Sequence, residues 1–66
     1  MILTINGENR TVGELASLAA LVASLGLDPR KVAVERNLEI VPRSAYAQTP
    51  IAEGDRIEIV HFIGGG

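Results

Sequence analysis

Cysteine and tryptophan are both absent from this sequence of 66 residues. Without cysteine, the chain can form no disulfide, offer no thiolate to a metal ion and use no thiol as a nucleophile. The sequence has only one phenylalanine and one tyrosine, so a core must be packed from aliphatic side chains. Any covalent chemistry must therefore use another group.

A strong charge of either sign is also missing, because the net charge is only -2. Without a basic stripe, neither nucleic-acid phosphates nor an anionic membrane surface is an expected partner. No run of about 18 apolar residues is present, and no basic segment precedes an apolar one at the N-terminus. We therefore expect a soluble, cytoplasmic protein.

Motifs for phosphate binding and for acid-base catalysis are missing as well. Gly7 and Gly54 are isolated turn glycines, and no glycine-rich loop precedes a helix. Any ATP that the function requires must therefore bind to another protein. His61 is the only histidine. It has no carboxylate or nucleophile partner in sequence, and we assign it neither catalysis nor metal binding. A domain of this size also has little room for an enclosed active site.

The residues that are present predict two strands followed by a helix. Asn6-Gly7 follows a short apolar run and predicts a two-residue hairpin turn, with a return strand over residues 9–11. Thr11 and Glu14 fit a capping box, so the helix is expected to begin at Val12. Its buried face is predicted from apolar residues at helical spacing, and a glycine ends it: Leu15, Leu18, Ala19, Val22, Leu25 and then Gly26.

Three further strands are expected after the helix. Residues 31–36 alternate in polarity, residues 40–41 form a short strand before a proline, and residues 56–63 are the longest β-branched run. Residues 44–51 are predicted as loop with one turn of helix at most. The sequence therefore predicts an α+β domain with a sheet of four or five strands and one helix, which leaves one sheet face uncovered.

The uncovered face is predicted to present apolar residues of the last strand. Ile57 and Ile59 should point toward the helix, which places Glu58, Val60 and Phe62 on the open side. Val60 and Phe62, extended by Ile2 on the first strand, are predicted to form a docking patch for a partner. Ordinary exposed apolar surface is the competing interpretation.

The chain ends in three glycines, which we predict to be a flexible tail over residues 64–66 after a domain over residues 1–63. Because Gly64 and Gly65 lack a Cβ atom, the backbone can enter a slot too narrow for other residues. The carboxylate of Gly66 would then be the reactive group, once activated as an acyl-adenylate. A frayed end or an expression scar is the competing interpretation.

This pattern resembles the ubiquitin-like β-grasp sulfur carriers, most closely the ThiS family of thiamine biosynthesis. The resemblance covers essentially the whole chain. A Val-Pro-Arg segment and the short length favour the thiamine branch over the small subunit of molybdopterin synthase. The matching segments are Ile5-Asn6-Gly7-Glu8, Thr11 to Leu15, Val32 to Asn37, Ile40-Val41-Pro42-Arg43, Glu53 to Val60 and Gly65-Gly66.

The resemblance implies a mixed β-grasp sheet on one main helix and the role of a protein cosubstrate rather than an enzyme. An E1-like adenylyltransferase would consume ATP to adenylate Gly66, and no cofactor or metal would be bound by the chain itself. A sulfur donor such as a cysteine desulfurase would convert the adenylate to a thiocarboxylate. Thiazole synthase would accept the sulfur, and Gly64 and Gly65 would give access to its active site.

Three other functions stay open from sequence. One is a sulfur carrier for molybdopterin or another pathway. Another is a noncatalytic ubiquitin-like interaction module, in which binding would rest on Val60 and Phe62 and the tail would be dispensable. The last is a ubiquitin-like protein modifier, which would form conjugates with lysine side chains.

Overall fold

The structure is a computed structural model that describes residues 1–62. One five-stranded sheet has the strand order β2-β1-β5-β3-β4, in which β1 and β5 are parallel and the other neighbours are antiparallel. The elements are β1 (Ile2–Ile5), β2 (Glu8–Thr11), α1 (Leu18–Ser24), β3 (Val32–Arg36), β4 (Glu39–Val41) and β5 (Arg56–His61), with 3-10 turns η1 (Pro29–Lys31) and η2 (Arg43–Gln48).

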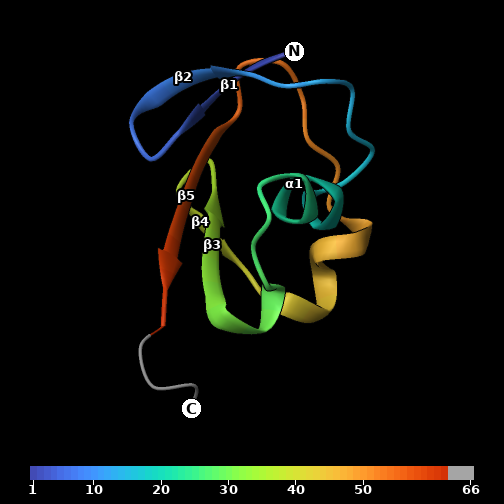
Figure 1. The fold of residues 1–66 in the computed structure, drawn as a ribbon, viewed down its shortest axis with the longest axis vertical. Coiled ribbons are helices and arrows are strands. Elements are labelled where there is room, and N and C mark those ends of the chain that lie inside the picture. Colours follow the sequence, from blue (N-terminus) through green and yellow to red (C-terminus); the bar gives the residue numbers. More distant parts are fainter. Residues whose placement is uncertain (63–66) are drawn as a thin grey trace.

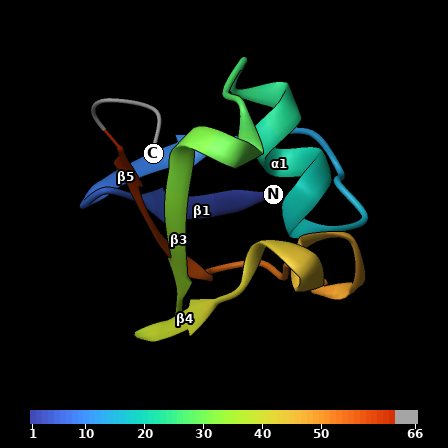
Figure 2. The same ribbon diagram turned by 90° about the horizontal axis from the view of Figure 1, so that it is seen from below.

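The sheet curves around α1, and η2 lies beside that helix on the same side (Figures 1 and 2). Side chains from the sheet, the helix and η2 share one aliphatic core, joined by the ring of Tyr46. Its fully buried members alternate along the strands and recur along the helix, as burial of one face of each element requires. The predicted α+β architecture with one main helix is therefore confirmed. The most deeply buried side chains are Leu3, Leu18, Leu21, Val22, Val34 and Ile57.

The opening hairpin forms as predicted. Asn6 and Gly7 have φ angles of 50° and 82°, so both central residues of the turn occupy the left-handed region. This is the turn whose twist matches that of antiparallel strands, and asparagine and glycine adopt it at low cost. The turn pairs Ile5 with Glu8 and so sets the register of β1 and β2.

The helix start was predicted wrongly, because α1 begins at Leu18 and not at Val12. The N–H of Val12 donates to the carbonyl of Met1 over 2.9 Å, so this residue still belongs to the hairpin. The helix is capped instead by Ser17, whose hydroxyl accepts from the N–H of Ala20 over 3.1 Å. Tertiary pairing to the N-terminus therefore overrides the local capping signal.

The helix end agrees with the sequence prediction. Gly26 has a φ of 74°, and its N–H donates to the carbonyl of Ala23. The N–H of Leu27 reaches back to the carbonyl of Val22 over 3.2 Å, which completes a Schellman-type end. The glycine therefore turns the chain from α1 toward η1 and β3.

A carboxylate network holds the start of β5. Asp55 is only 7% exposed. It accepts hydrogen bonds from the backbone of Ala52, the guanidinium of Arg36 and the amide of Asn37, over 2.8, 2.8 and 3.1 Å. Burial alone would raise the pKa of Asp55, but these three donors together lower it below its ordinary value. Arg36 is thus part of an ion pair at the edge of the core.

Candidate functional site

The central strand β5 presents one buried face and one open face. It lies between β1 and β3, and Ile57 and Ile59 are buried beneath the helix. Val60 and Phe62 point to the opposite side, where they are 62% and 56% exposed. The predicted facing of these four residues is therefore confirmed.

The strand register determines what lies beside Val60 on the open face. Ala33 of β3 is its direct partner, and Glu35 of β3 is opposite Glu58 of β5. On the edge strand β4, Ile40 is opposite Glu35 and is 77% exposed. We call the resulting surface the open-face patch, and it consists of Ala33, Glu35, Ile40, Glu58, Val60 and Phe62.

Ile2 does not belong to this patch, although the sequence prediction placed it there. The carbonyl of Ile2 accepts from the N–H of Gly54 over 2.8 Å, so Ile2 lies beside the start of β5. Phe62 lies beyond the other end of that strand, roughly 26 Å away at about 3.3 Å per residue. Figure 1 shows the N-terminus and the final end of β5 at opposite ends of the molecule. Parallel pairing of β1 with β5 thus separates the two residues.

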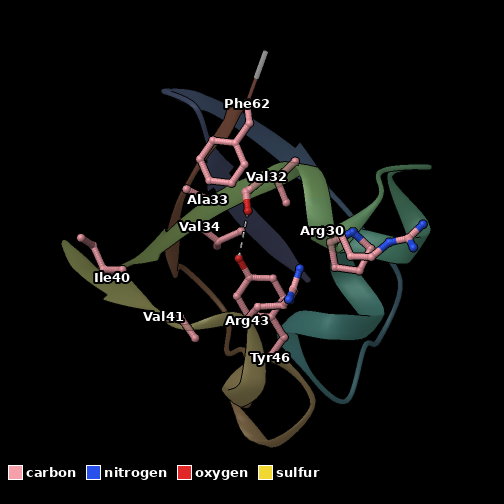
Figure 3. Close-up of a pocket in the computed structure, with 10 residues that line it drawn as sticks. Arg30, Val32, Ala33, Val34, Ile40, Val41, Arg43, Tyr46 and Phe62 are labelled. Atoms are coloured by element: carbon pink, nitrogen blue, oxygen red, sulfur yellow. Dashed lines mark hydrogen bonds between the residues drawn. The ribbon is translucent and has the colours of Figure 1, made fainter. Parts of the chain in front are cut away.

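A hollow of about 270 Å³ opens where the patch meets η2 (Figure 3). Phe62 and Ala33 line one part of it, while Arg43 and the buried Tyr46 line another. The hydroxyl of Tyr46 is 3.5 Å from the carbonyl of Val32, and burial raises the pKa of this phenol. Tyr46 therefore supports the sheet as a core residue and is not an exposed acid or base.

The end of β5 is held on both sides. The N–H of Phe62 donates to the carbonyl of Lys31 over 2.9 Å, on the β3 side. On the β1 side, the side chain of Asn6 accepts a hydrogen bond from the backbone N–H of Ile59 and donates one to the carbonyl of the same residue. The strand that leads toward the glycine run is consequently anchored up to Phe62. Gly64, Gly65 and Gly66 lie outside the described residues, and their roles stay predictions.

His61 lies on the helix side of β5 and is exposed. It lines a shallow hollow of about 230 Å³ together with Asn6 and Arg10. Residues 1–62 contain no group of three or more side chains that could hold a metal ion. Within the same range, no helix is long and apolar enough to cross a membrane. The open-face patch is therefore the candidate functional surface of the described chain.

The residues that sequence reasoning missed are Ala33, Glu35 and Ile40. The alternation of residues 31–36 already indicated that Ala33 and Glu35 share a face. It could not indicate that both would lie beside Glu58 and Val60 of β5, because strands distant in the sequence pair in a register that only the folded chain displays.

A five-stranded mixed sheet wrapped around one helix, with a central final strand, defines a ubiquitin-like β-grasp domain. The model of the ThiS family matches residues 3–66. The chain belongs to the ThiS family. The family predicted from the sequence is therefore confirmed.

Relatives and a solved structure agree with this assignment. The chain is 38% identical to the sulfur carrier protein ThiS of Bacillus subtilis, over 98% of this chain and all of that protein. A crystal structure of the thiamine biosynthesis protein (ThiS) from Geobacter metallireducens superposes with a TM-score of 0.85 at 36% identity and covers both chains completely.

A second kind of relative is much longer than this chain. The chain is 59% identical over its whole length to a thiazole synthase of Paramagnetospirillum magneticum, and it spans only 20% of that protein. A thiazole synthase of Magnetococcus marinus is matched in the same way, with 46% identity and the same share of 20%. The chain thus spans about a fifth of the length of these curated relatives.

Proposed function

We propose that this domain carries sulfur for thiazole formation in thiamine biosynthesis, as a thiocarboxylate on Gly66. An oxygen of the Gly66 carboxylate attacks the α-phosphorus of ATP, and pyrophosphate leaves. The terminal sulfur of a persulfide on the sulfur donor then attacks the acyl carbon, and AMP leaves. A thiol reductant cleaves the S–S bond of the resulting acyl disulfide, is itself oxidised to a disulfide, and releases the thiocarboxylate. The product keeps one oxygen and one sulfur on the terminal carbonyl carbon, and the sulfur is later passed to thiazole synthase.

One observation carries this proposal: the central strand β5 is followed by an anchored Phe62, a few residues before the last glycine of this sequence, in a chain without cysteine. A protein that lacks thiols can hold sulfur covalently on an activated acyl group. Three residues without side chains let that group reach a recessed active site, because glycine removes the Cβ that would block a narrow passage. Gly64 and Gly65 serve this access.

Partner proteins supply the catalysis in this scheme. An E1-like adenylyltransferase binds and consumes ATP, and a sulfur donor such as a cysteine desulfurase supplies the sulfur. Thiazole synthase accepts it, which the long relatives with that name support. Val60 and Phe62 dock such partners. All three partners would meet the domain in the cytoplasm.

The test is mass spectrometry of the intact chain after incubation with ATP, an E1-like adenylyltransferase, a cysteine desulfurase, cysteine and a thiol reductant such as dithiothreitol. We expect an exchange of oxygen for sulfur that fragmentation assigns to Gly66. A chain that lacks Gly66 would still bind its partners but should support no thiazole formation. An unmodified terminus after complete turnover of the donor system would refute the proposal. Equal thiazole formation by the shortened chain would favour an interaction module.

A further inference from the structure

Two carboxylates face each other in the middle of the open-face patch. Glu35 of β3 and Glu58 of β5 are direct partners across the antiparallel ladder. Directly opposite residues have Cβ atoms about 4.5–5.5 Å apart, and like charges at this position destabilise a sheet. Both glutamates are half-buried, so water screens their repulsion less than it would on an open surface.

Neither glutamate has a cationic partner in the described part of the chain. The ion pairs within residues 1–62 join Asp28 to Arg30 and Arg36 to Asp55. Arg56 is the preceding residue of β5 on the open face, yet it forms no ion pair with Glu35 or Glu58. The repulsion therefore stays uncompensated within the described chain.

Apolar side chains surround this acidic pair. Ala33 and Val60 lie next to it toward the end of β5, and Ile40 lies across from Glu35 on the edge strand. These three residues, both glutamates and Val34 line a hollow of about 110 Å³. Two acidic and four apolar residues thus share the hollow, and Ile40 and Val60 are mostly exposed beside it.

We propose that this hollow receives one arginine or lysine side chain of thiazole synthase, while apolar groups around that cation cover Ile40, Val60 and Phe62. The inference rests on the proposed function, which names thiazole synthase as the acceptor. The aliphatic stem of the cationic side chain would contact Ile40 and Val60, and its charged end would lie between the two carboxylates.

The acidic pair would also exclude wrong partners. A purely apolar surface placed on the patch would remove water from Glu35 and Glu58 without compensating their charges, which is strongly unfavourable. A surface with a correctly placed cation would relieve the repulsion that the free domain retains. Charge complementarity therefore decides which apolar surface can cover the anchored end of β5.

The test compares two double variants of the full chain for binding to purified thiazole synthase by calorimetry. E35Q/E58Q removes the two facing charges, while E8Q/E14Q removes two charges from exposed residues outside the patch. We expect E35Q/E58Q to raise Kd about tenfold or more, and to reduce the salt dependence of binding. The control should bind as the unaltered chain does. Unchanged binding by E35Q/E58Q, or an equal loss in the control, would overturn the inference.

Urea unfolding separates this recognition role from a structural one. Because like-charge repulsion is removed, E35Q/E58Q should be at least as stable as the unaltered chain, even though it binds less tightly. A variant that loses stability and binding together would contradict the inference. So would a concentration-dependent dimer that E35Q/E58Q abolishes, because a second copy of this chain would then occupy the face.

The same experiments distinguish the two proposals. If E35Q/E58Q binds thiazole synthase normally while removal of Gly66 abolishes thiazole formation, the docking inference is wrong and the carrier function stands. If E35Q/E58Q loses binding but the unaltered chain never acquires sulfur, the carrier proposal is wrong and the docking surface stands.

Discussion

The side chain of Asn6 acts as an extra segment of strand beside Ile59. Its Oδ1 accepts from the N–H of Ile59 over 2.7 Å, and its Nδ2 donates to the carbonyl of the same residue over 3.1 Å. The backbone N–H of Asn6 still donates to the carbonyl of Ile57 over 2.9 Å, and the chain then leaves β5 in the hairpin turn, where Asn6 has a φ of 50°. One carboxamide thus extends the parallel pairing of β5 toward the end of the chain.

Replacing Asn6 with glycine should therefore destabilise the domain and loosen the end of β5. Glycine keeps the left-handed turn accessible, so the change isolates the loss of the carboxamide. Two backbone groups would lose their partner, and we expect a loss of about 1–3 kcal/mol in the free energy of unfolding. Hydrogen exchange at the Ile59 amide, measured by NMR, should accelerate more than exchange at the core amide of Val34.

Asn9→Ala is the matched control for this change. Asn9 lies on the exposed strand of the same hairpin, and its Oδ1 accepts a hydrogen bond from the hydroxyl of Thr4 over 3.1 Å. We expect the free energy of unfolding to change by about 0.5 kcal/mol or less. If both asparagine variants lose the same stability, the special role of Asn6 is refuted.

Asp55 should make stability depend on pH in the acidic range. Its folded-state pKa lies below the ordinary value of 3.8, because the donors from Ala52, Asn37 and Arg36 outweigh the effect of burial. The stability from this carboxylate is therefore fully present above pH 3.8 and is lost as the pH falls through the lowered folded-state pKa. Chemical unfolding at several pH values between neutrality and strong acid measures this loss.

Asp55→Asn should remove most of that dependence. At neutral pH we expect it to cost about 2–4 kcal/mol, because a charged hydrogen-bond acceptor at the core edge is replaced. Asp28→Asn is the control, since the side-chain hydrogen bond from Arg30 lowers the pKa of Asp28 to about 2 at an exposed site. Water screens that ion pair, so D28N should change the acid profile little. An acid profile of D55N equal to that of the unaltered chain would contradict this account.

The position of the helix start can be tested with two alanine variants. Ser17→Ala removes the observed cap of α1 and should cost about 1 kcal/mol. Thr11→Ala removes the hydroxyl on which the predicted capping box depends, and it should cost about 0.5 kcal/mol or less. Urea denaturation followed by circular dichroism gives both values. A larger loss for T11A than for S17A would mean that the helix begins earlier than α1 does.

The turn between β3 and β4 offers a stabilising substitution. Leu38 has a φ of 71° and is 73% exposed, so it adopts a strained backbone without burying its side chain. Leu38→Gly should raise the melting temperature and add up to about 1 kcal/mol, because an Asn-Gly pair suits this type of turn. Leu38→Ala keeps the strain and should give no such gain. Equal effects of L38G and L38A in calorimetry would contradict this explanation.

Much of the fold was predictable because its signals are local. The Asn6-Gly7 turn, the glycine after the helix and the alternation along β3 and β5 each depend on neighbouring residues. The helix start was not predictable in this way. Thr11 and Glu14 carry a valid capping pattern, but the bond from Val12 to Met1 keeps the chain in the hairpin.

The candidate site also has features that local sequence predicted and features that only long-range pairing decided. From its alternation, the sequence by itself determined that Val60 and Phe62 leave the core, and its final glycine provides the carboxylate on which the carrier proposal depends. Only the tertiary structure decided that Glu35 would face Glu58. It also decided that Ile2 would lie beside the start of β5, far from Phe62 beyond the other end of that strand. The physical reason is that pairing between strands distant in the sequence depends on the whole buried core, while the direction of each side chain depends only on its own strand.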